Sequence, residues 1–201
     1  MKKIDKMKKI LRIIILIFIV IIAIYSFIFV LPKRNNHNFK EEDKVMDYVL
    51  YDRDTDIYKD IFSKLKEELS KESIDYEKYA EYISELFIID LYTLENKNNK
   101  NDVGGKMYVY DSIKDNFILN ASDTLYKYIG LSKELPKVSS IELLNITKKE
   151  YNIGDKTYDS YVVSLKWDYE KDLGYDKEGS VIVIRDDKKL YVVEKNDERI
   201  N

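Results

Sequence analysis

The longest hydrophobic stretch of the chain runs from Ile10 to Leu31, and from Ile13 onward it contains no charged side chain. Its only polar side chains there are Tyr25 and Ser26. An α-helix rises about 1.5 Å per residue, so about 19 to 22 residues span about 28 to 33 Å, close to the roughly 30 Å hydrocarbon core of a bilayer. A helix that is apolar on every side is stable in lipid. Residues 10–31 are therefore predicted to form a transmembrane helix.

Basic residues are concentrated in front of this stretch. Residues 1–9 contain five lysines, whereas only Lys33 and Arg34 closely follow the apolar run. The positive-inside rule places residues 1–9 in the cytoplasm and the chain beyond Pro32 outside. A cleaved signal peptide has a similar layout, but its apolar core has only about 7 to 15 residues and ends at a small-residue cleavage site, which is missing here. We predict an uncleaved, single-pass anchor in the plasma membrane, with the lipid bilayer as its first partner.

Three stretches beyond the polar linker 32–40 show the apolar spacing of three and four residues that is typical of amphipathic helices. They cover residues 41–71 with an interruption near 52–56, residues 73–91, and residues 113–130. Ser73 or Asp75 is suited to cap the second helix, and Gly130 is suited to end the third. The Asn-rich segment 95–105, which ends in Gly-Gly, predicts a solvent-facing loop.

The pattern changes after Pro136 to β-branched and aromatic runs separated by turn residues. The expected strands are residues 140–151, 157–169, 179–185 and 189–195. The second run alternates between apolar and polar side chains, as a half-buried strand does. Short links between successive strands require an antiparallel meander. We therefore expect an extracytoplasmic α+β domain over residues 41–201, with about three helices packed on a curved, four-stranded meander.

Composition excludes several classes of function. After residue 34 the chain has 26 basic and 36 acidic residues, a net charge of about −10, which disfavours binding to nucleic acid. The absence of cysteine excludes disulfides, thiol nucleophiles and Cys-ligated metals. The abundance of Lys over Arg, together with many Ile, Asn and Tyr residues, is typical of an AT-rich genome. We therefore expect the outer face of a Gram-positive bacterial plasma membrane.

Two acidic segments have some features of a metal site. Residues 52–56 imitate the start of a calcium loop, but Ile57 replaces the required Gly and Ser63 the required Glu. The turn 168–178 contains several carboxylates and is better explained as a solvated acidic turn. The only histidine, His37, lies in the linker, so no His-based triad or multi-His site is expected. The sequence thus predicts no metal, no cofactor and no catalytic constellation.

Asp90 is the one candidate for a buried polar or pocket residue. It follows an apolar run and shares a helical face with Ile83, Leu86 and Phe87, so partial burial is expected. A buried carboxylate must find hydrogen-bond donors or shift its pKa upward. One interpretation is an acid or base in a pocket. The other, which we favour, is a structural carboxylate that accepts hydrogen bonds from the Asn-rich loop or a tyrosine.

The order of elements, from an anchor through several helices to a curved antiparallel meander, resembles the cone-shaped nuclear transport factor two-like superfamily. Membrane-anchored members serve as extracytoplasmic scaffold subunits of type IV secretion and conjugation machines. The string FIIDLYTLENKNNKNDVGG, Phe87 to Gly105, also resembles a segment in anchored hypothetical proteins of Firmicutes. The resemblance implies a fold over residues 41–195. In enzymes of this superfamily an Asp or His with a Tyr lies inside the cone, a role open to Asp90 only if it faces a cavity.

From the anchor and the resemblance we expect a non-enzymatic assembly or interaction domain. Its partners would be other membrane or cell-envelope proteins, or further copies of itself. Two alternatives stay open because fold does not determine function. The domain could bind or hydrolyse a small molecule in the interior of the cone. Its eighteen tyrosines also leave a cell-wall or glycan-sensing role open.

Overall fold

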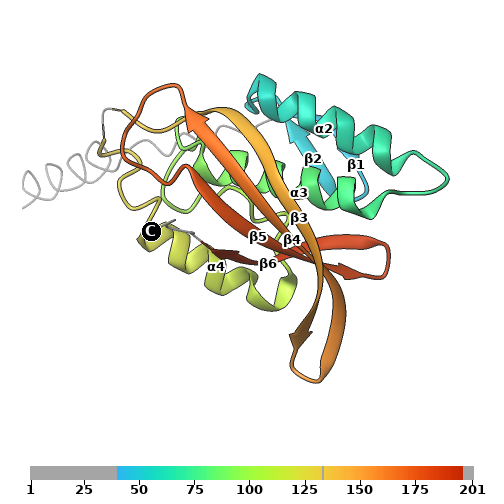
Figure 1. The fold of residues 1–201 in the computed structure, drawn as a ribbon. Helices are drawn as coiled ribbons and strands as arrows, with labels where there is room; N and C mark the ends of the chain where they lie inside the picture. Colours follow the sequence, from blue (N-terminus) through green and yellow to red (C-terminus); the bar gives the residue numbers. More distant parts are fainter. Residues whose placement is uncertain (1–39, 133, 197–201) are drawn as a thin grey trace, which may run out of the picture. The chain divides into compact units, whose positions relative to one another are not determined.

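The computed structural model describes residues 40–132 and 134–196, which belong to one compact unit (Figure 1). The predicted cytoplasmic tail and transmembrane helix, and nearly all of the linker, lie outside the described residues. Within these two ranges no helix is both long and apolar enough to cross a bilayer. The described part is an α+β structure with three helices and a four-stranded antiparallel sheet, which confirms the expected fold class.

The prediction of a helix over residues 41–71 is wrong for its first part, because residues 41–51 form a β-hairpin. Strand β1, Glu41–Val45, pairs antiparallel with β2, Tyr48–Tyr51. In β2 the side chains alternate, with Tyr48 and Leu50 buried and the residues between them partly exposed. The apolar positions in this short segment fit helical spacing and strand alternation equally well. Pairing between the two strands decides in favour of the hairpin.

The two helices that follow the hairpin each begin at an N-terminal capping residue. Thr55 caps α2, Asp56–Leu69, by accepting a hydrogen bond from the backbone of the first turn. Asp75 caps α3, Tyr76–Tyr92, in the same way and with two backbone donors. Of the two caps that were expected for the second helix, Asp75 is therefore the one used.

The third helix, α4, is shorter than the range expected from its apolar spacing. It covers Asp111–Asp123 and ends where the backbone of Thr124 leaves helical geometry, with φ −115° and ψ −89°. A series of turns follows as far as Leu131. Gly130, at φ +86°, is therefore part of a turn and does not end the helix.

The four expected strands are present and form a meander in the order β3-β4-β5-β6. Their bounds are Val138–Ile153, Lys156–Tyr169, Glu178–Asp186 and Lys189–Asn196. Figure 1 shows these strands bent and strongly twisted. On β4, Tyr161, Val163, Leu165 and Trp167 are buried on one face, as the alternation predicted. Lys166 and Asp168, on its other face, are exposed.

The main core lies between the sheet and α3, which contacts all four strands of the sheet. Helix α2 packs on α3, and two ion pairs join α2 to β1. At the far edge of the sheet, the backbone of Tyr108–Tyr110 runs parallel to β6 and exchanges two hydrogen bonds with Val192, of 2.8 and 2.9 Å. Helix α4 starts directly after this segment. Its Ile113, with Tyr110, covers a second, smaller apolar cluster on the opposite face of the sheet.

Candidate functional site

Asp90 lies in the last turns of α3 and is held on both carboxylate oxygens. Lys97 Nζ donates to Oδ1, and the backbone N–H of Gly105 donates to Oδ2 at 2.6 Å. The Lys97 side chain is fully buried, and that of Asp90 is 12% exposed. Burial alone raises the pKa of Asp90, but the charge of Lys97 and the two hydrogen bonds outweigh it and hold the pKa below its usual value. Asp90 is therefore an ionised carboxylate in a buried ion pair.

The Asn-rich loop can close over α3 because it ends in two glycines. A Cβ on Gly104 would lie 2.0 Å from the Asp90 carbonyl oxygen. Gly105 adopts φ +74°, and a Cβ there would lie 2.8 Å from the Phe87 ring. Both positions therefore need glycine, one for a close backbone approach and the other also for its left-handed conformation.

The expectation that residues 95–105 form a solvent-facing loop is correct only for part of the segment. Residues 98–101 are exposed, whereas Lys97 and the residues from Val103 to Gly105 are buried. Lys97 can be buried because its ion pair with Asp90 offsets the free-energy cost of removing its ammonium group from water. A lysine in an Asn-rich run gives no local signal of burial, so sequence reasoning missed it.

A second ion pair ties the same loop to the chain after the hairpin. Arg53 forms a bidentate contact with Asp102, at 2.5 and 3.1 Å. Asn96 adds two further links. Its side-chain amide donates to the Arg53 backbone carbonyl oxygen at 3.2 Å, and its backbone carbonyl oxygen accepts from Arg53 Nη1 at 3.4 Å. The arginine fork lowers the pKa of Asp102 against the raising effect of burial. We call Arg53, Asp90, Lys97 and Asp102 the ion-pair cluster.

Asp54, next to this cluster, behaves differently. Burial, with a contribution from the charge of Asp90, raises its pKa to about 6, although the Tyr51 N–H donates to Asp54 Oδ2 at 2.7 Å and opposes the shift. The hydroxyls of Tyr58 and Tyr108 form a buried hydrogen bond with each other. Burial, reinforced by the charges of Asp90 and Asp54, holds the pKa of Tyr58 well above its usual value. The phenols of Tyr58 and Tyr108 and the carboxyl group of Asp54, all with a raised pKa, therefore lie next to the ion-pair cluster.

Two cavities lie near this region, and Asp90 lines neither of them. The first, of about 310 Å³, is mostly polar and open to solvent. Its lining residues are Arg53, Thr55, Asp56, Thr93, Glu95, Asn96 and Lys137. The second, of about 280 Å³, is an apolar groove between α4 and β6, with Phe87 at its base. The pocket role considered for Asp90 therefore finds no support in either cavity.

The two acidic segments considered as metal sites are occupied by internal contacts. In residues 52–56, Arg53 pairs with Asp102 and Thr55 caps α2. In the turn 168–178, Lys177 bridges two aspartates at 3.0 and 3.1 Å. In the part of the chain that the structure covers, no group of three or more His, Asp or Glu side chains is arranged to hold a metal ion. His37 lies outside that part.

No protein family model, no curated protein and no solved structure matches the chain.

Proposed function

We propose that the chain is a single-pass membrane protein whose residues 41–201 form an extracytoplasmic assembly or interaction domain, of the kind found in secretion or conjugation complexes. The observation behind this proposal is the uncharged run Ile13–Leu31, which follows a lysine-rich tail and precedes a folded acidic domain. Tethering confines such a domain to one membrane surface and raises its effective concentration toward partners there.

The state of Asp90 supports a structural role for the one residue that sequence analysis singled out. Both of its oxygens are engaged, and its negative charge neutralises a fully buried lysine. A general acid or base needs a proton that it can exchange with a substrate, and its pKa is tuned toward the working pH. The pKa of Asp90 is shifted in the opposite direction.

The succession of elements supports the comparison with the nuclear transport factor two-like fold. After the β1–β2 hairpin come helices α2 and α3, then the short extended segment beside β6, then α4 and the four-stranded meander. Members of that superfamily include pure assembly parts, which is the role we propose here.

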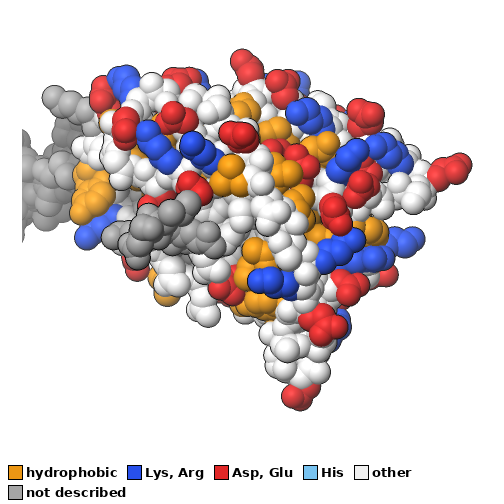
Figure 2. Space-filling view, in the orientation of Figure 1, with side chains coloured by type: hydrophobic (Ala, Val, Ile, Leu, Met, Phe, Trp, Pro, Cys, Tyr) orange, Lys and Arg blue, Asp and Glu red, His pale blue; other side chains and the backbone are white. Residues whose placement is uncertain are grey.

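The surface of the domain favours contact with other proteins. Figure 2 shows acidic and basic side chains interspersed over one face, with hydrophobic side chains in small groups between them. The groove between α4 and β6 adds an apolar surface lined by Ile113 and Phe117 on one side and by β6 on the other. Only Ala121 and Ser122 of α4 are buried, so most of this helix remains accessible to a partner.

A second candidate, binding of a small molecule, rests on the polar cavity. Arg53 and Lys137 offer positive charge there, and Asp56 and Glu95 offer negative charge. A small zwitterion has both signs and fits such a lining. The absence of any thermal shift with a panel of amino acids and dipeptides would reject this second function.

The leading proposal can be tested with single-cysteine variants, because the natural chain has no cysteine. Asn116 is exposed on α4 and lines the apolar groove. In intact cells, Asn116→Cys should react with a membrane-impermeant maleimide, whereas Lys3→Cys should react only after the cells are opened. Protection of Asn116→Cys that is relieved when the cells are opened would contradict the proposed orientation, whereas protection that persists would indicate a partner over α4.

The same variant tests the interaction role. A membrane-impermeant crosslinker that carries a maleimide at one end and a photoreactive group at the other should link Asn116→Cys to a neighbouring envelope protein or to a second copy of the chain, because the photoreactive end needs no thiol on the partner. Glu72→Cys, exposed in the connection between α2 and α3, serves as the matched control and should give much less product. Equal yields, or monomer alone at both positions, would contradict an interaction surface at α4.

A further inference from the structure

Two of the most exposed apolar side chains in the described part of the chain lie in one short turn. In the described ranges the large apolar residues with the greatest exposure are Leu131 at 79%, Leu119 at 58% and Tyr128 at 55%. The Leu131 N–H donates to the Tyr128 carbonyl oxygen at 3.0 Å, so these two residues belong to a single turn. Lys127 Nζ lies 5.5 Å from the centre of the Tyr128 ring. We call residues 127–131 the apolar turn.

This composition is unusual for a surface exposed only to water. Leu131 presents most of its side chain to solvent, and the free energy of leaving apolar area in water is unfavourable. Tyrosine and lysine next to an exposed leucine are typical of the membrane interface, where rings sit at headgroup level and ammonium groups meet phosphates.

A series of hydrogen bonds and ion pairs links the apolar turn to the point where the chain enters the domain. The Lys40 carbonyl oxygen accepts from Asp52 N–H at 3.0 Å, and the next residue, Arg53, pairs with Asp102. Two residues further on, Gly104 N–H donates to the hydroxyl of Tyr126 at 2.9 Å. Tyr126 directly precedes the apolar turn.

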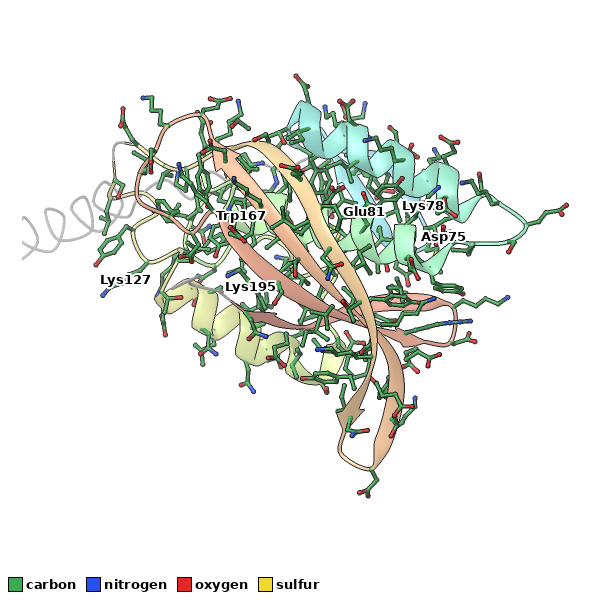
Figure 3. The ribbon with its side chains drawn as sticks, in the orientation of Figure 1. Asp75, Lys78, Glu81, Lys127, Trp167 and Lys195 are labelled. Carbon is green, nitrogen blue, oxygen red and sulfur yellow. The ribbon has the colours of Figure 1, made fainter. Side chains whose placement is uncertain are left out.

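In Figure 3, Lys127 projects outward at one end of the domain, and Asp75 lies toward the other end. Between the end of the predicted transmembrane helix and Lys40 there are only residues 32–39. Eight residues span at most about 28 Å when fully extended. Lys40, the residue to which this series of contacts leads back, therefore lies within about this distance of any bilayer that holds the predicted helix.

We propose that the apolar turn is a second membrane contact, with Tyr128 and Leu131 inserted at the headgroup level of the lipid bilayer and Lys127 facing lipid phosphates. This inference rests on the proposed function, because it requires the anchor. The contact would set the orientation of the domain relative to the bilayer.

The test uses the full chain reconstituted into vesicles of phosphatidylcholine and phosphatidylglycerol in a 3:1 ratio. A nitroxide spin label is attached to Leu131→Cys, or to Leu144→Cys as the matched control. Leu144 is another exposed leucine, 45% accessible, in the middle of β3. It lies six residues from the start of β3, about 20 Å along the strand. Collision rates with oxygen, which dissolves in lipid, and with a water-soluble nickel complex report the depth of each label.

We expect the ratio of oxygen to nickel collisions to be several-fold higher at position 131 than at position 144. Equal ratios at the two positions would overturn the contact, and so would protection of position 131 from both reagents, which would indicate a protein partner instead of lipid. Flotation of the vesicles separates this failure from failure of the proposed function. A chain that does not float with the vesicles, or that alkaline carbonate extracts, lacks the anchor itself.

Discussion

The pairing of Asp90 with Lys97 shows how a single contact organises the loop around it. The two residues are seven positions apart, and their side chains meet because the chain reverses direction after α3. Removal of one partner leaves an uncompensated charge in the interior, which costs more than the intact pair contributes. The pair therefore specifies the position of the loop more than it adds net stability.

Replacing Asp90 with Ala should lower the free energy of unfolding by about 3 to 5 kcal/mol, because Lys97 then loses its counter-charge in a buried site. Denaturant unfolding of the full chain in detergent, followed by the fluorescence of Trp167, measures this change. The signal is clean because Trp167 is the only tryptophan and is 2% exposed.

Two variants serve as controls for this effect. The double variant Asp90→Leu, Lys97→Met should recover the part of the loss that comes from the unpaired charge, because it replaces the pair with apolar groups of similar size, although the Gly105 N–H stays without its acceptor. Asp111→Ala removes an exposed partner of Lys114 and should leave unfolding unchanged. If the double variant is as unstable as Asp90→Ala, the buried charge is not the cause.

At the scale of elements, α3 is the helix around which the domain is built. It contacts every strand of the sheet on one side and α2 on another, and eleven of its seventeen residues are buried. A helix covered on so many sides buries one acidic residue away from the ion-pair cluster, Glu85, which is 7% exposed. Burial, with a smaller effect of Glu81, raises its pKa from 4.5 to about 7.

The raised pKa of Glu85 predicts a specific dependence of stability on pH. The unfolded chain releases this proton near pH 4.5 and the folded chain near pH 7, so the contribution of the protonated group to stability declines as the pH rises between these values. Glu85→Gln stays neutral throughout. Its advantage in unfolding free energy over the natural chain should therefore grow by about 2 to 3 kcal/mol between pH 4 and pH 8.

Unfolding curves at several pH values test this expectation. Glu67→Gln, at an exposed position on α2, is the matched control and should show no such trend. A constant difference between Glu85→Gln and the natural chain across the pH range would exclude the proposed burial of an ionisable group.

At the scale of the whole molecule, buried tyrosine hydroxyls join elements that are far apart in the sequence. Tyr48, in the first hairpin, donates to the Leu190 carbonyl oxygen on the last strand at 2.8 Å and shares a hydrogen bond of 2.9 Å with Tyr79 on α3. The N-terminal hairpin and the C-terminal strand are thereby tied through the core. Such contacts hold distant segments of the domain together in a chain that has no cysteine and therefore no disulfides.

Tyr48→Phe should lower the free energy of unfolding by about 1 to 2 kcal/mol, because it leaves the buried Leu190 carbonyl oxygen without this donor while keeping the ring in place. The same denaturant assay in detergent measures the loss. Tyr128→Phe, at an exposed position, should have no effect. A loss of the same size in both variants would show that the buried hydroxyl is not responsible.

Sequence reasoning succeeded where short-range physics decides the outcome. The Asp75 cap depends on two neighbouring N–H groups, and the buried face of β4 depends on strict alternation. It failed at β1 and β2, where few residues are available and two periodicities fit equally well. For the site, it identified Asp90 as a partly buried residue, but Lys97, Arg53 and Asp102 carry no local pattern that distinguishes them from surface charges.

The sequence by itself determined the α+β class, the succession of the four strands in the main sheet and their antiparallel order, because periodicity and short turns are local properties of the chain. It also predicts the anchor over residues 10–31, because the length of an uninterrupted hydrophobic run can be counted directly in the sequence. Only the tertiary structure decided that residues 41–51 form a hairpin and that Lys97 is buried against Asp90. Both outcomes depend on partners brought together by folding, and the free energy of such contacts is not encoded in any short segment.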